Sequence, residues 1–336
     1  MRVAFFGTKT FDRESFDDSN EANHRFHFDI DYFDVALTER TLPLAHGYQT
    51  VCAFVNDDLS APILRDLHKH GTSIIALRCA GYNNLDLETA DAIGMTVVHV
   101  PSYSPEAVAE HTVALMLTLN RKTHKAYQRT RDANFNLDGL VGFNLFGKTV
   151  GIIGTGQIGL AAIRIFRGFG MRVIAHDPHE RSEAKELGAE YVDLDTLFRQ
   201  SDVITLHCPL FEANYHILNA EAFAKMKKGV MVINTSRGAL LNSADAIEAL
   251  KDGTISALGL DVYEEESELF FQDKSNEVIP DDVFRRLSAC HNVLFTGHQA
   301  FLTREALVAI ADTTLENLAL LDRDDPCDNI LHHKGK

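Results

Sequence analysis

A six-residue glycine pattern constrains the fold of this chain more than any other feature of its sequence. The pattern G-x-G-x-x-G occupies residues 154–159, between the apolar run Thr149–Ile153 and an apolar stretch typical of a helix. In the order strand, glycines, helix, each glycine has its own physical task. Gly154 permits a tight turn, Gly156 lets the backbone approach a phosphate group, and Gly159 lets the helix pack closely on the strand. The free N–H groups at the start of such a helix bind anions.

An acidic residue follows the next predicted strand. This strand is predicted over Arg172–His176, and Asp177 comes directly after it, eighteen residues beyond Gly159. A carboxylate here suits the two ribose hydroxyls of NAD and would repel the 2′-phosphate of NADP. The alternative is an ordinary glycine-rich turn and a surface aspartate, which leaves the order of strand, glycines and helix unexplained. The sequence therefore predicts a dinucleotide site for NAD or NADH.

Composition excludes several classes of protein. A chain of 336 residues is long enough for two domains that each bury a core. Its formal net charge of -16 argues against a nucleic-acid or anionic-membrane partner, and the acidity is best explained as an aid to solubility. No apolar run approaches the roughly 20 residues that span a bilayer. The apolar start, Met1–Gly7, is too short for a signal peptide and is predicted to be a strand.

The cysteines indicate a reducing compartment. The chain has five cysteines, an odd number, and they are scattered along the sequence without a C-x-x-C pair. This pattern argues against a disulfide framework and against a zinc site. We therefore expect a cytoplasmic protein without a metal centre.

The first hundred residues alternate strand-like and helix-like segments. Strands are predicted over Val3–Phe6, Phe26–Phe33, Val51–Val55, Ile74–Leu77 and Val97–Val100. Helices are predicted over Ala61–His70 and Asp86–Ile93, each followed by a glycine that can end it. Alternation of this kind indicates a mostly parallel sheet with helices on both faces. This part lacks a phosphate-binding glycine pattern, so we do not expect it to hold the nucleotide.

A helix is predicted to open the second part of the chain. Ser104 is its predicted cap, Pro105 its first residue, and it runs to about Asn120. Apolar residues occur almost all round this helix, which predicts burial, either in a core or between subunits. We therefore expect a homodimer or a homotetramer.

From Thr149 onward, strands and helices again alternate. Six strands are predicted, at Val150–Ile153, Arg172–His176, Asp202–His207, Val230–Asn234, Ile255–Leu260 and Asn292–Phe295. Helices are predicted over 157–169, 182–187, 195–200, 219–227 and 243–251. Thr303 is predicted to cap a last helix from Arg304 to about Leu321, and the charged tail after it is expected to be mobile.

The predicted fold class is α/β, with two doubly wound parallel-sheet domains and a cleft between them. The sheet of the second part is complete by residue 296, so the last helix is expected to return to the first domain. We predict a substrate domain made of residues 1–100 plus 299–336 and a Rossmann NAD-binding domain made of residues 101–298. Small ligands usually bind in such a cleft.

Chemically capable side chains follow the predicted strands of the second part. Because the ends of parallel strands meet at one edge of a sheet, these side chains should lie near the ligand. Arg237 can hold a carboxylate through two parallel hydrogen bonds, and His298 can donate a proton to a ketone oxygen. A carboxylate beside the imidazole would fix its tautomer, but the residues alone do not choose among Glu264, Glu265 and Glu266. Taken singly, these groups could equally be a surface ion pair, a satisfied histidine and a solvated acidic run.

Several motifs give the chain a resemblance to the D-isomer-specific 2-hydroxyacid dehydrogenases, and within them to the fermentative D-lactate dehydrogenases of bacteria. The resemblance covers nearly the whole chain. It depends on the segments 54–58, 77–84, 100–111, 154–159, 234–238, 261–264 and 282–301. The last of these segments is typical of the lactate branch. One departure is Gly297, where many members of the family have a proline.

The resemblance implies a fold, a reaction and a set of site residues. The first domain would be flavodoxin-like, and the enzyme would reduce pyruvate to D-lactate with NADH. Arg237 would bind the substrate carboxylate, His298 would donate the proton, and Glu266 would be its partner. The cofactor would contact Gly154, Gly156, Gln157, Ile158, Gly159, Asp177, Cys208, Pro209, Asn214, Thr235, Ser236, Arg237 and Asp261. The substrate would also contact Arg78, Cys79, Ala80 and Gly81, which belong to the other domain, and Tyr103, which lies near them.

Two further interpretations stay open on the sequence. The same chemistry could act on a bulkier 2-keto acid, because pocket shape decides that preference. A non-enzymatic NAD-sensing protein is a remote alternative, since co-repressors of transcription use the same fold. A phosphoglycerate dehydrogenase is disfavoured, because no extra regulatory domain follows the last helix.

Overall fold

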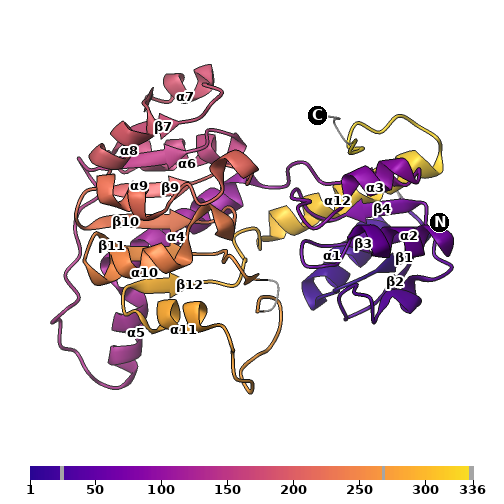
Figure 1. Ribbon diagram of the computed structural model, residues 1–336, viewed down its shortest axis with the longest axis horizontal. Coiled ribbons are helices and arrows are strands. Elements are labelled where there is room, and N and C mark those ends of the chain that lie inside the picture. Colours follow the sequence, from indigo (N-terminus) through magenta and orange to yellow (C-terminus); the bar gives the residue numbers. More distant parts are fainter. Residues whose placement is uncertain (23–25, 267–268, 333–336) are drawn as a thin grey trace. The chain divides into compact units, whose positions relative to one another are not determined.

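The computed structural model describes residues 1–22, 26–266 and 269–332. The chain divides into two compact units. The first unit is Met1–Ser104 with Leu302–Lys336, and the second is Pro105–Phe301. Each unit has its own parallel sheet and its own helices (Figure 1).

The sheet of the first unit has five parallel strands in the order β2-β1-β3-β4-β5. The strands are β1 (Arg2–Phe5), β2 (Asp29–Tyr32), β3 (Thr50–Ala53), β4 (Ile74–Leu77) and β5 (Thr96–Val98). This order is that of flavodoxin-like folds. β3 and β4 are buried along their whole length, as expected for central strands covered on both faces. All five predicted strands are present, and the predicted fold class of this unit is confirmed.

Helices cover this sheet, and one of them comes from the end of the chain. The helices are α1 (Thr10–Glu21), η2 (Leu42–Ala45), α2 (Ala61–Lys69), α3 (Leu87–Ala92) and α12 (Arg304–Asp322). α12 packs against α1 and β4, and the Thr303 hydroxyl caps it by accepting a hydrogen bond from the Ala306 N–H at 3.2 Å. The predicted return of the last helix is therefore correct. α1 was not predicted, because its sequence is mostly polar and gives little apolar periodicity.

The tail beyond α12 is bound to the sheet, so the expectation that it is mobile is wrong as far as residue 331. Ile330 forms an antiparallel bridge with Val98 at the edge strand β5. The N–H of Leu331 donates to the Val97 carbonyl at 2.8 Å. The side chain of Asn329 donates to Asn317 of α12 at 2.8 Å. The sequence did not indicate this pairing, because the segment that pairs is only a few residues long and follows the charged residues 322–325.

The sheet of the second unit has seven parallel strands in the order β12-β11-β10-β9-β6-β7-β8. The strands are β6 (Thr149–Ile153), β7 (Arg172–His176), β8 (Ala189–Tyr191), β9 (Val203–Leu206), β10 (Val230–Asn234), β11 (Ile255–Leu260) and β12 (Val293–Phe295). The strand order reverses between β6 and β9. A doubly wound sheet binds its ligand at such a switch point. The predicted Rossmann class is confirmed.

The second sheet differs from its prediction by one strand. β8 is the seventh strand and has only three residues, of which Ala189 alone is buried. A segment this short carries no measurable alternation of apolar and polar residues, which is why it was missed. Helices α5 (Thr123–Arg131) and α11 (Asp282–Ala289) were missed as well, because α5 buries none of its side chains and α11 buries only Leu287.

Helices pack on both faces of this sheet and create two apolar cores. They are α4 (Pro105–Arg121), α5 (Thr123–Arg131), α6 (Gln157–Gly168), α7 (Ser182–Glu186), α8 (Leu194–Gln200), η3 (Glu212–Asn214), α9 (Ala220–Lys225), η4 (Gly238–Leu240), α10 (Ser243–Lys251) and α11 (Asp282–Ala289). No helix in the described part of the chain combines the length and the apolar character that crossing a membrane requires.

The apolar helix α4 is buried within its own unit. It packs against α6, β10 and β11, and Leu115 and Leu119 lie beside Gly259 of β11. A side chain at Gly259 would come within 3.1 Å of Leu119. The burial of α4 is thus explained without a second subunit.

Candidate functional site

The glycine turn after β6 has the geometry that its sequence predicts. Gly154 has a φ of 96°, and a Cβ there would lie 2.6 Å from the Cys208 nitrogen. A Cβ at Gly159 would lie 2.2 Å from the Gly154 carbonyl oxygen. At Gly156 no neighbouring protein atom lies within 4 Å of that position, so this side of the turn is open. The turn therefore leaves space where a ligand could approach the backbone.

This open turn lies at the start of α6. Gly156 is the cap of the helix, and Gln157 and Ile158 form its first turn. The first N–H groups of a helix carry a partial positive charge and have no partner within the helix. The turn thus fits a dinucleotide pyrophosphate. The structure brings together the five residues predicted for this turn, which are Gly154, Gly156, Gln157, Ile158 and Gly159.

Asp177 is bound to the same turn. Its Oδ2 accepts hydrogen bonds from the Thr155 N–H at 2.7 Å and from the Thr155 hydroxyl at 3.1 Å. Its Oδ1 accepts from the His179 N–H at 2.8 Å. Partial burial opposes ionisation, but these hydrogen bonds outweigh it and lower the pKa of Asp177. The structure therefore places an ionised carboxylate beside the glycines, as a ribose-binding acid requires.

The segments after β9 and β10 lie beside each other near the turn. The Ser236 hydroxyl donates to the Cys208 carbonyl at 2.5 Å, which joins the two segments. Asn214 donates to the Pro209 carbonyl at 2.7 Å and orders the loop that follows. Thr235 is hydrogen-bonded through its hydroxyl to that of Thr112 on α4 at 2.8 Å. Burial raises the pKa of Cys208 to about 11, so this thiol remains protonated and is not a nucleophile.

Arg237 stands directly before η4 and is partly exposed. Its Nη1 donates to the Ser236 carbonyl at 2.7 Å, and in the described part of the chain it forms no ion pair with a carboxylate. The next residue, Gly238, is in close contact with the segment after β11, because a Cβ there would lie 2.0 Å from the Tyr263 carbonyl carbon. Arg237 is therefore held beside that segment, and its guanidinium has donors to spare for an anionic ligand.

Asp261, the first residue after β11, organises the loop after β12. Its side chain is fully buried. It accepts hydrogen bonds from the Gln299 N–H at 3.0 Å, from the Ala300 N–H at 2.8 Å and from the Thr296 hydroxyl. His111 of α4 places Nε2 3.3 Å from Oδ1 of the same carboxylate. Burial opposes ionisation, yet the hydrogen bonds from His111, Thr296 and the loop N–H groups lower the pKa of Asp261.

His298 lies in this loop and pairs with Glu266. Its Nδ1 lies 2.8 Å from Oε1 of Glu266. The other carboxylate oxygen of Glu266 accepts from the Tyr263 N–H at 3.0 Å, which fixes the direction of the side chain. His298 has a φ of 52°, and its N–H donates to the Asp261 carbonyl at 2.7 Å. The loop that Asp261 organises therefore holds the backbone of His298 in the left-handed conformation, which residues other than glycine seldom adopt.

The structure also separates the three consecutive glutamates. Glu264 contacts Nε2 of His216 at 2.5 Å and accepts from the Ser243 N–H at 2.9 Å. Glu265 is exposed. Glu266 alone is hydrogen-bonded to His298, and the choice that the residues left open is thereby made by geometry.

The candidates near residue 80 belong to the first unit. Arg78 is only 2% exposed, and its guanidinium lies between the rings of Phe5 and Phe54, at 4.4 and 4.8 Å from their centroids. Its Nε lies 3.4 Å from Oδ1 of Asp12. The Arg78 guanidinium is therefore enclosed in the core of the first unit, and the substrate contact expected of this residue stays a prediction.

The neighbours of Arg78 are more accessible. Ala80 and Gly81 are partly exposed, and the thiol of Cys79 donates to the Gly81 carbonyl at 3.2 Å. Tyr103 is partly exposed in the same unit. The substrate contacts of these four residues stay predictions.

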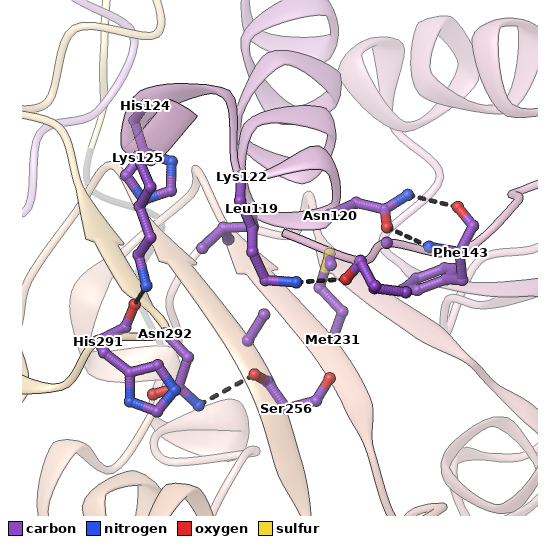
Figure 2. Close-up of a pocket in the computed structure, with 13 residues that line it drawn as sticks. Leu119, Asn120, Lys122, His124, Lys125, Phe143, Met231, Ser256, His291 and Asn292 are labelled. Carbon is purple, nitrogen blue, oxygen red and sulfur yellow. Dashed lines mark hydrogen bonds between the residues drawn. The ribbon is translucent and has the colours of Figure 1, made fainter. Parts of the chain in front are cut away.

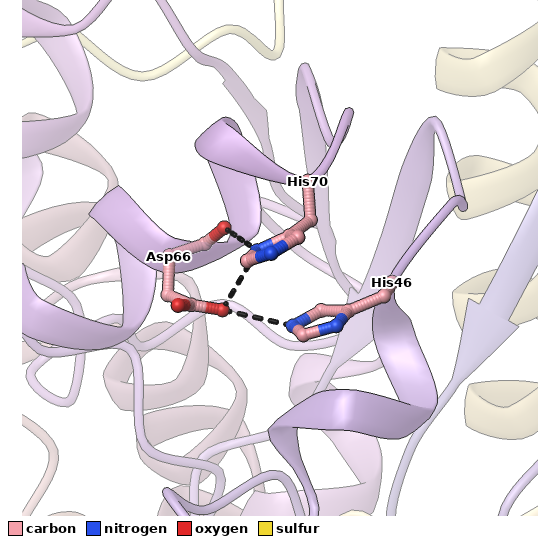
Figure 3. Close-up of side chains that lie close together, drawn as sticks. All are labelled: His46, Asp66 and His70. Atoms are coloured by element: carbon pink, nitrogen blue, oxygen red, sulfur yellow. Dashed lines mark hydrogen bonds and ion pairs between the residues drawn. The ribbon is translucent and has the colours of Figure 1, made fainter.

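A cluster of possible metal ligands also lies in the first unit. His46 and His70 both contact Oδ1 of Asp66, at 2.9 and 3.1 Å, and their rings stack with centroids 3.7 Å apart (Figure 3). The rings are only 13° from parallel. An imidazole binds a metal in the plane of its ring, and one ion cannot lie in two parallel, stacked planes. As arranged, the cluster is a hydrogen-bonded stack. The hydrogen bond from His46 is the main cause of the lowered pKa of Asp66.

Sequence reasoning missed the part that His111 and Thr296 play. Both contact the Asp261 carboxylate, and they also contact each other at 3.1 Å. The two residues lie 185 positions apart in the chain. A histidine within an apolar helix was the only signal in the sequence, and it did not indicate a partner.

The chain is similar to known dehydrogenases over nearly its whole length. The family model for the NAD-binding domain of D-isomer-specific 2-hydroxyacid dehydrogenases matches residues 113–300. The D-lactate dehydrogenase of Escherichia coli K12 is 60% identical over 331 residues, which are 98% of this chain and 100% of that protein. The 2-hydroxyacid dehydrogenase homologue of Haemophilus influenzae is 57% identical over 98% of this chain and 99% of its own length.

Solved structures give the same result. The apo structure of the Escherichia coli D-lactate dehydrogenase has a TM-score of 0.89 at 57% identity, over 98% of this chain and 100% of that one. The NAD complex of a D-isomer-specific 2-hydroxyacid dehydrogenase from Lactobacillus delbrueckii ssp. bulgaricus has a TM-score of 0.80 at 28% identity, over 99% and 100% of the two chains. With two doubly wound sheets, a nucleotide turn and a paired histidine in place, the chain belongs to the D-isomer-specific 2-hydroxyacid dehydrogenases.

Proposed function

We propose that this protein is an NAD-dependent D-lactate dehydrogenase that reduces pyruvate to D-lactate. The observation that carries the proposal is the 2.8 Å contact between His298 and Glu266. It supplies a proton donor with a fixed orientation, at the same edge of the sheet as the nucleotide turn. The D-lactate dehydrogenase of Escherichia coli, which is 60% identical to this chain, supports D-lactate as the product and therefore pyruvate as the 2-keto acid.

The second unit is the proposed NAD-binding domain, and the first unit is the proposed substrate domain. Gly154–Gly159, Asp177 and the segments after β9 and β10 would hold the cofactor. When bound, NADH supplies a hydride for the keto carbon. Asp177 favours NADH over NADPH, because an ionised carboxylate would repel a 2′-phosphate.

His298 is the proposed proton donor. Nδ1 of the imidazole is hydrogen-bonded to Glu266, so Nε2 remains available to face the substrate. A protonated imidazole delivers its proton from Nε2 to the ketone oxygen as the alcohol forms, and the neutral ring accepts it again in the reverse reaction. The Glu266 carboxylate stabilises the imidazolium before transfer. The two carboxylate oxygens of Glu266 have different partners. Oε1 is hydrogen-bonded to the imidazole, and Oε2 accepts from the Tyr263 N–H.

Arg237 is the proposed site for the substrate carboxylate. Its guanidinium already donates to its own chain at Ser236, which limits the directions it can take. The remaining N–H groups can bind a carboxylate through two parallel hydrogen bonds. A lysine could not reproduce this fork, so the residue fixes the orientation of the 2-keto acid as well as its charge.

Turnover of 2-keto acids tests the proposed reaction. We expect NADH to be consumed fastest with pyruvate, NADPH to be a poor substitute, and the product to be D-lactate on a chiral column. Branched-chain and aromatic 2-keto acids should react more slowly. Faster turnover of one of these acids would keep the mechanism and change the substrate, whereas no turnover of any 2-keto acid would contradict the proposal.

Replacing the proton donor should slow the reaction without unfolding the protein. In His298→Gln we expect kcat to fall at least about 100-fold, the lower range for loss of a general acid. NADH should still bind with nearly native affinity, as measured by calorimetry. His68→Gln changes an exposed histidine on α2 and serves as the control. Near-native turnover in His298→Gln would rule out this role.

Asp261 should act as a positioning residue, and its replacement should also cost stability. Asp261→Asn retains the size of the side chain but loses charge-assisted hydrogen bonds to the loop of His298. We expect the free energy of unfolding to fall by about 3 kcal/mol at pH 7 and kcat to fall at least about tenfold. Urea denaturation and steady-state kinetics measure the two effects, with Asp282→Asn, at an exposed site, as the control.

The stability difference should depend on pH in one direction. The pKa of Asp261 in the folded protein is lower than its unfolded value of about 3.9. Its carboxylate therefore stabilises the fold fully above that value, and the stabilisation is lost as the pH falls through the folded pKa. The gap between the native protein and Asp261→Asn should shrink below about pH 4. A gap that stays constant from pH 7 to the acid range would contradict this account.

We also propose that the protein is a homo-oligomer that assembles through the second unit. An apolar surface lies on α5 and on the long connection from α5 to β6, which follows the edge of this unit (Figure 1). Its exposed side chains are Tyr127, Phe135, Leu137, Val141, Phe143 and Phe146. Large exposed apolar side chains gathered on one stretch of chain favour an interaction surface there. The odd number and wide spacing of the cysteines, none of them bonded, support a cytoplasmic location.

Sedimentation equilibrium tests the oligomer. We expect a mass that is a multiple of the 37.4 kDa chain, and a shift toward the monomer when Phe135 and Leu137 are both changed to Glu. Val278→Glu introduces the same charge at an equally exposed site outside this surface and should leave the mass unchanged. A native protein that sediments as a monomer would contradict the proposal.

A further inference from the structure

A pocket lies in the second unit, at the end of the sheet opposite the nucleotide turn. Its cavity volume is about 300 Å³. It is lined by Met231 at the start of β10, by Ser256 at the start of β11 and by Asn292 just before β12. The proposed catalytic residues follow the other ends of these strands. β11 has six residues, so the two ends of the sheet are separated by about 17 Å.

The pocket is basic although the protein is acidic. Two lysines and two histidines line it, and none of the thirteen lining residues is an aspartate or a glutamate. The chain as a whole has 48 acidic residues against 32 lysines and arginines. A cavity lined by one sign of charge focuses its field and concentrates ions of the opposite sign. The pocket therefore favours an anion.

The two lysines reach different walls of the pocket (Figure 2). Lys122 donates to the Val141 carbonyl, and Lys125 donates to the His291 carbonyl. These bonds hold the ammonium groups in place, and each group retains further N–H donors. Neither lysine forms an ion pair with a carboxylate in the described part of the chain. Two fixed positive charges on separate walls suit a ligand that carries more than one negative charge.

A histidine stands between the two lysines in the sequence, and one of its ring nitrogens lacks a hydrogen bond in the part of the chain that the structure describes. His124 lines the pocket, and its Nδ1 is buried without a hydrogen bond among the described residues. Burial lowers the pKa of His124, and the charge of Lys125 lowers it further, against the effect of the nearby Thr118 carbonyl. Burial and the charges of Lys122 and Arg129 lower the pKa of Lys125 in the same way. A bound anion would relieve this repulsion.

We propose that this pocket binds a small anion with two or more negative charges, a phosphate group or a dicarboxylate, at a site separate from the nucleotide and the substrate. A phosphate accepts hydrogen bonds from lysine ammonium groups, which act as point charges. The volume is at the lower end of the range for small-molecule sites, about 300–1,000 Å³. The site adjoins Val141 and Phe143 of the apolar surface described above, so an anion here would lie beside the proposed subunit contact.

Calorimetric titration of the native oligomer tests the site. Inorganic phosphate and succinate are titrated separately at constant ionic strength, with the enzyme saturated with NADH so that the pyrophosphate site is filled. We expect saturable binding of at least one of the two anions, which identifies the class of ligand. Affinity should fall at least about tenfold in the double variant Lys122→Gln/Lys125→Gln, which loses charge-assisted hydrogen bonds.

Three further variants make the result specific. Lys69→Gln removes an exposed lysine on α2 and should bind the anion normally. Lys122→Arg/Lys125→Arg keeps both charges and should retain binding, and Arg237→Gln should retain it because the substrate site is separate. Loss of binding in Arg237→Gln would assign the anion to the substrate site and overturn the proposal. So would equal affinity in the native protein and in a folded Lys122→Gln/Lys125→Gln variant, or no saturable binding of either anion.

Discussion

One buried carboxylate holds the reactive edge of the second unit together. Asp261 accepts hydrogen bonds from two backbone N–H groups of the loop after β12 and from a threonine of that loop, and it contacts His111 of α4. A buried charge is costly unless it is fully paired, so these partners cannot be removed singly without penalty. The backbone of Asp261 also accepts from the N–H of His298. The hydrogen bonds of Asp261 thus fix the loop that carries the His298 imidazole.

The sheet order explains why such a carboxylate is needed. Parallel strands bring β6, β10, β11 and β12 to one edge, but each strand is followed by a separate segment of chain. Contacts between neighbouring segments then fix their relative positions. Ser236 bonds to Cys208, Gly238 contacts Tyr263, and Asp261 binds the loop of His298. Each contact joins segments that follow different strands, so the loops that carry the site are bound to one another.

Features set by local sequence could be predicted, and features set by tertiary partners could not. The glycine turn, Asp177 and the alternation of strands and helices follow from neighbouring residues, and the structure contains them. The short strand β8, the polar helix α1 and the bound tail at Ile330 carry little local signal. The enclosure of Arg78 between Phe5 and Phe54 brings together residues from three separate parts of the chain, so nothing in the sequence indicated that this guanidinium is buried.

The choice of Glu266 shows the same limit within the site. Glu264, Glu265 and Glu266 are chemically identical, and resemblance to a family was needed to select one of them. In the structure their surroundings differ completely, because His216 and the start of α10 bind Glu264 whereas His298 binds Glu266. Only the fold brings these partners, from positions 216, 243 and 298, to one short segment.

The net charge of the protein makes local positive charge decisive. A chain with a formal charge of -16 repels pyruvate, NADH and phosphate at long range. Salt screens that repulsion beyond about 8–10 Å, so a ligand inside a pocket responds mainly to the nearest groups. At one end of the second sheet those groups are Arg237 and the start of α6, and at the other they are Lys122 and Lys125. An acidic protein can therefore present two separate anion-binding ends on one sheet, because each field acts only over a few residues.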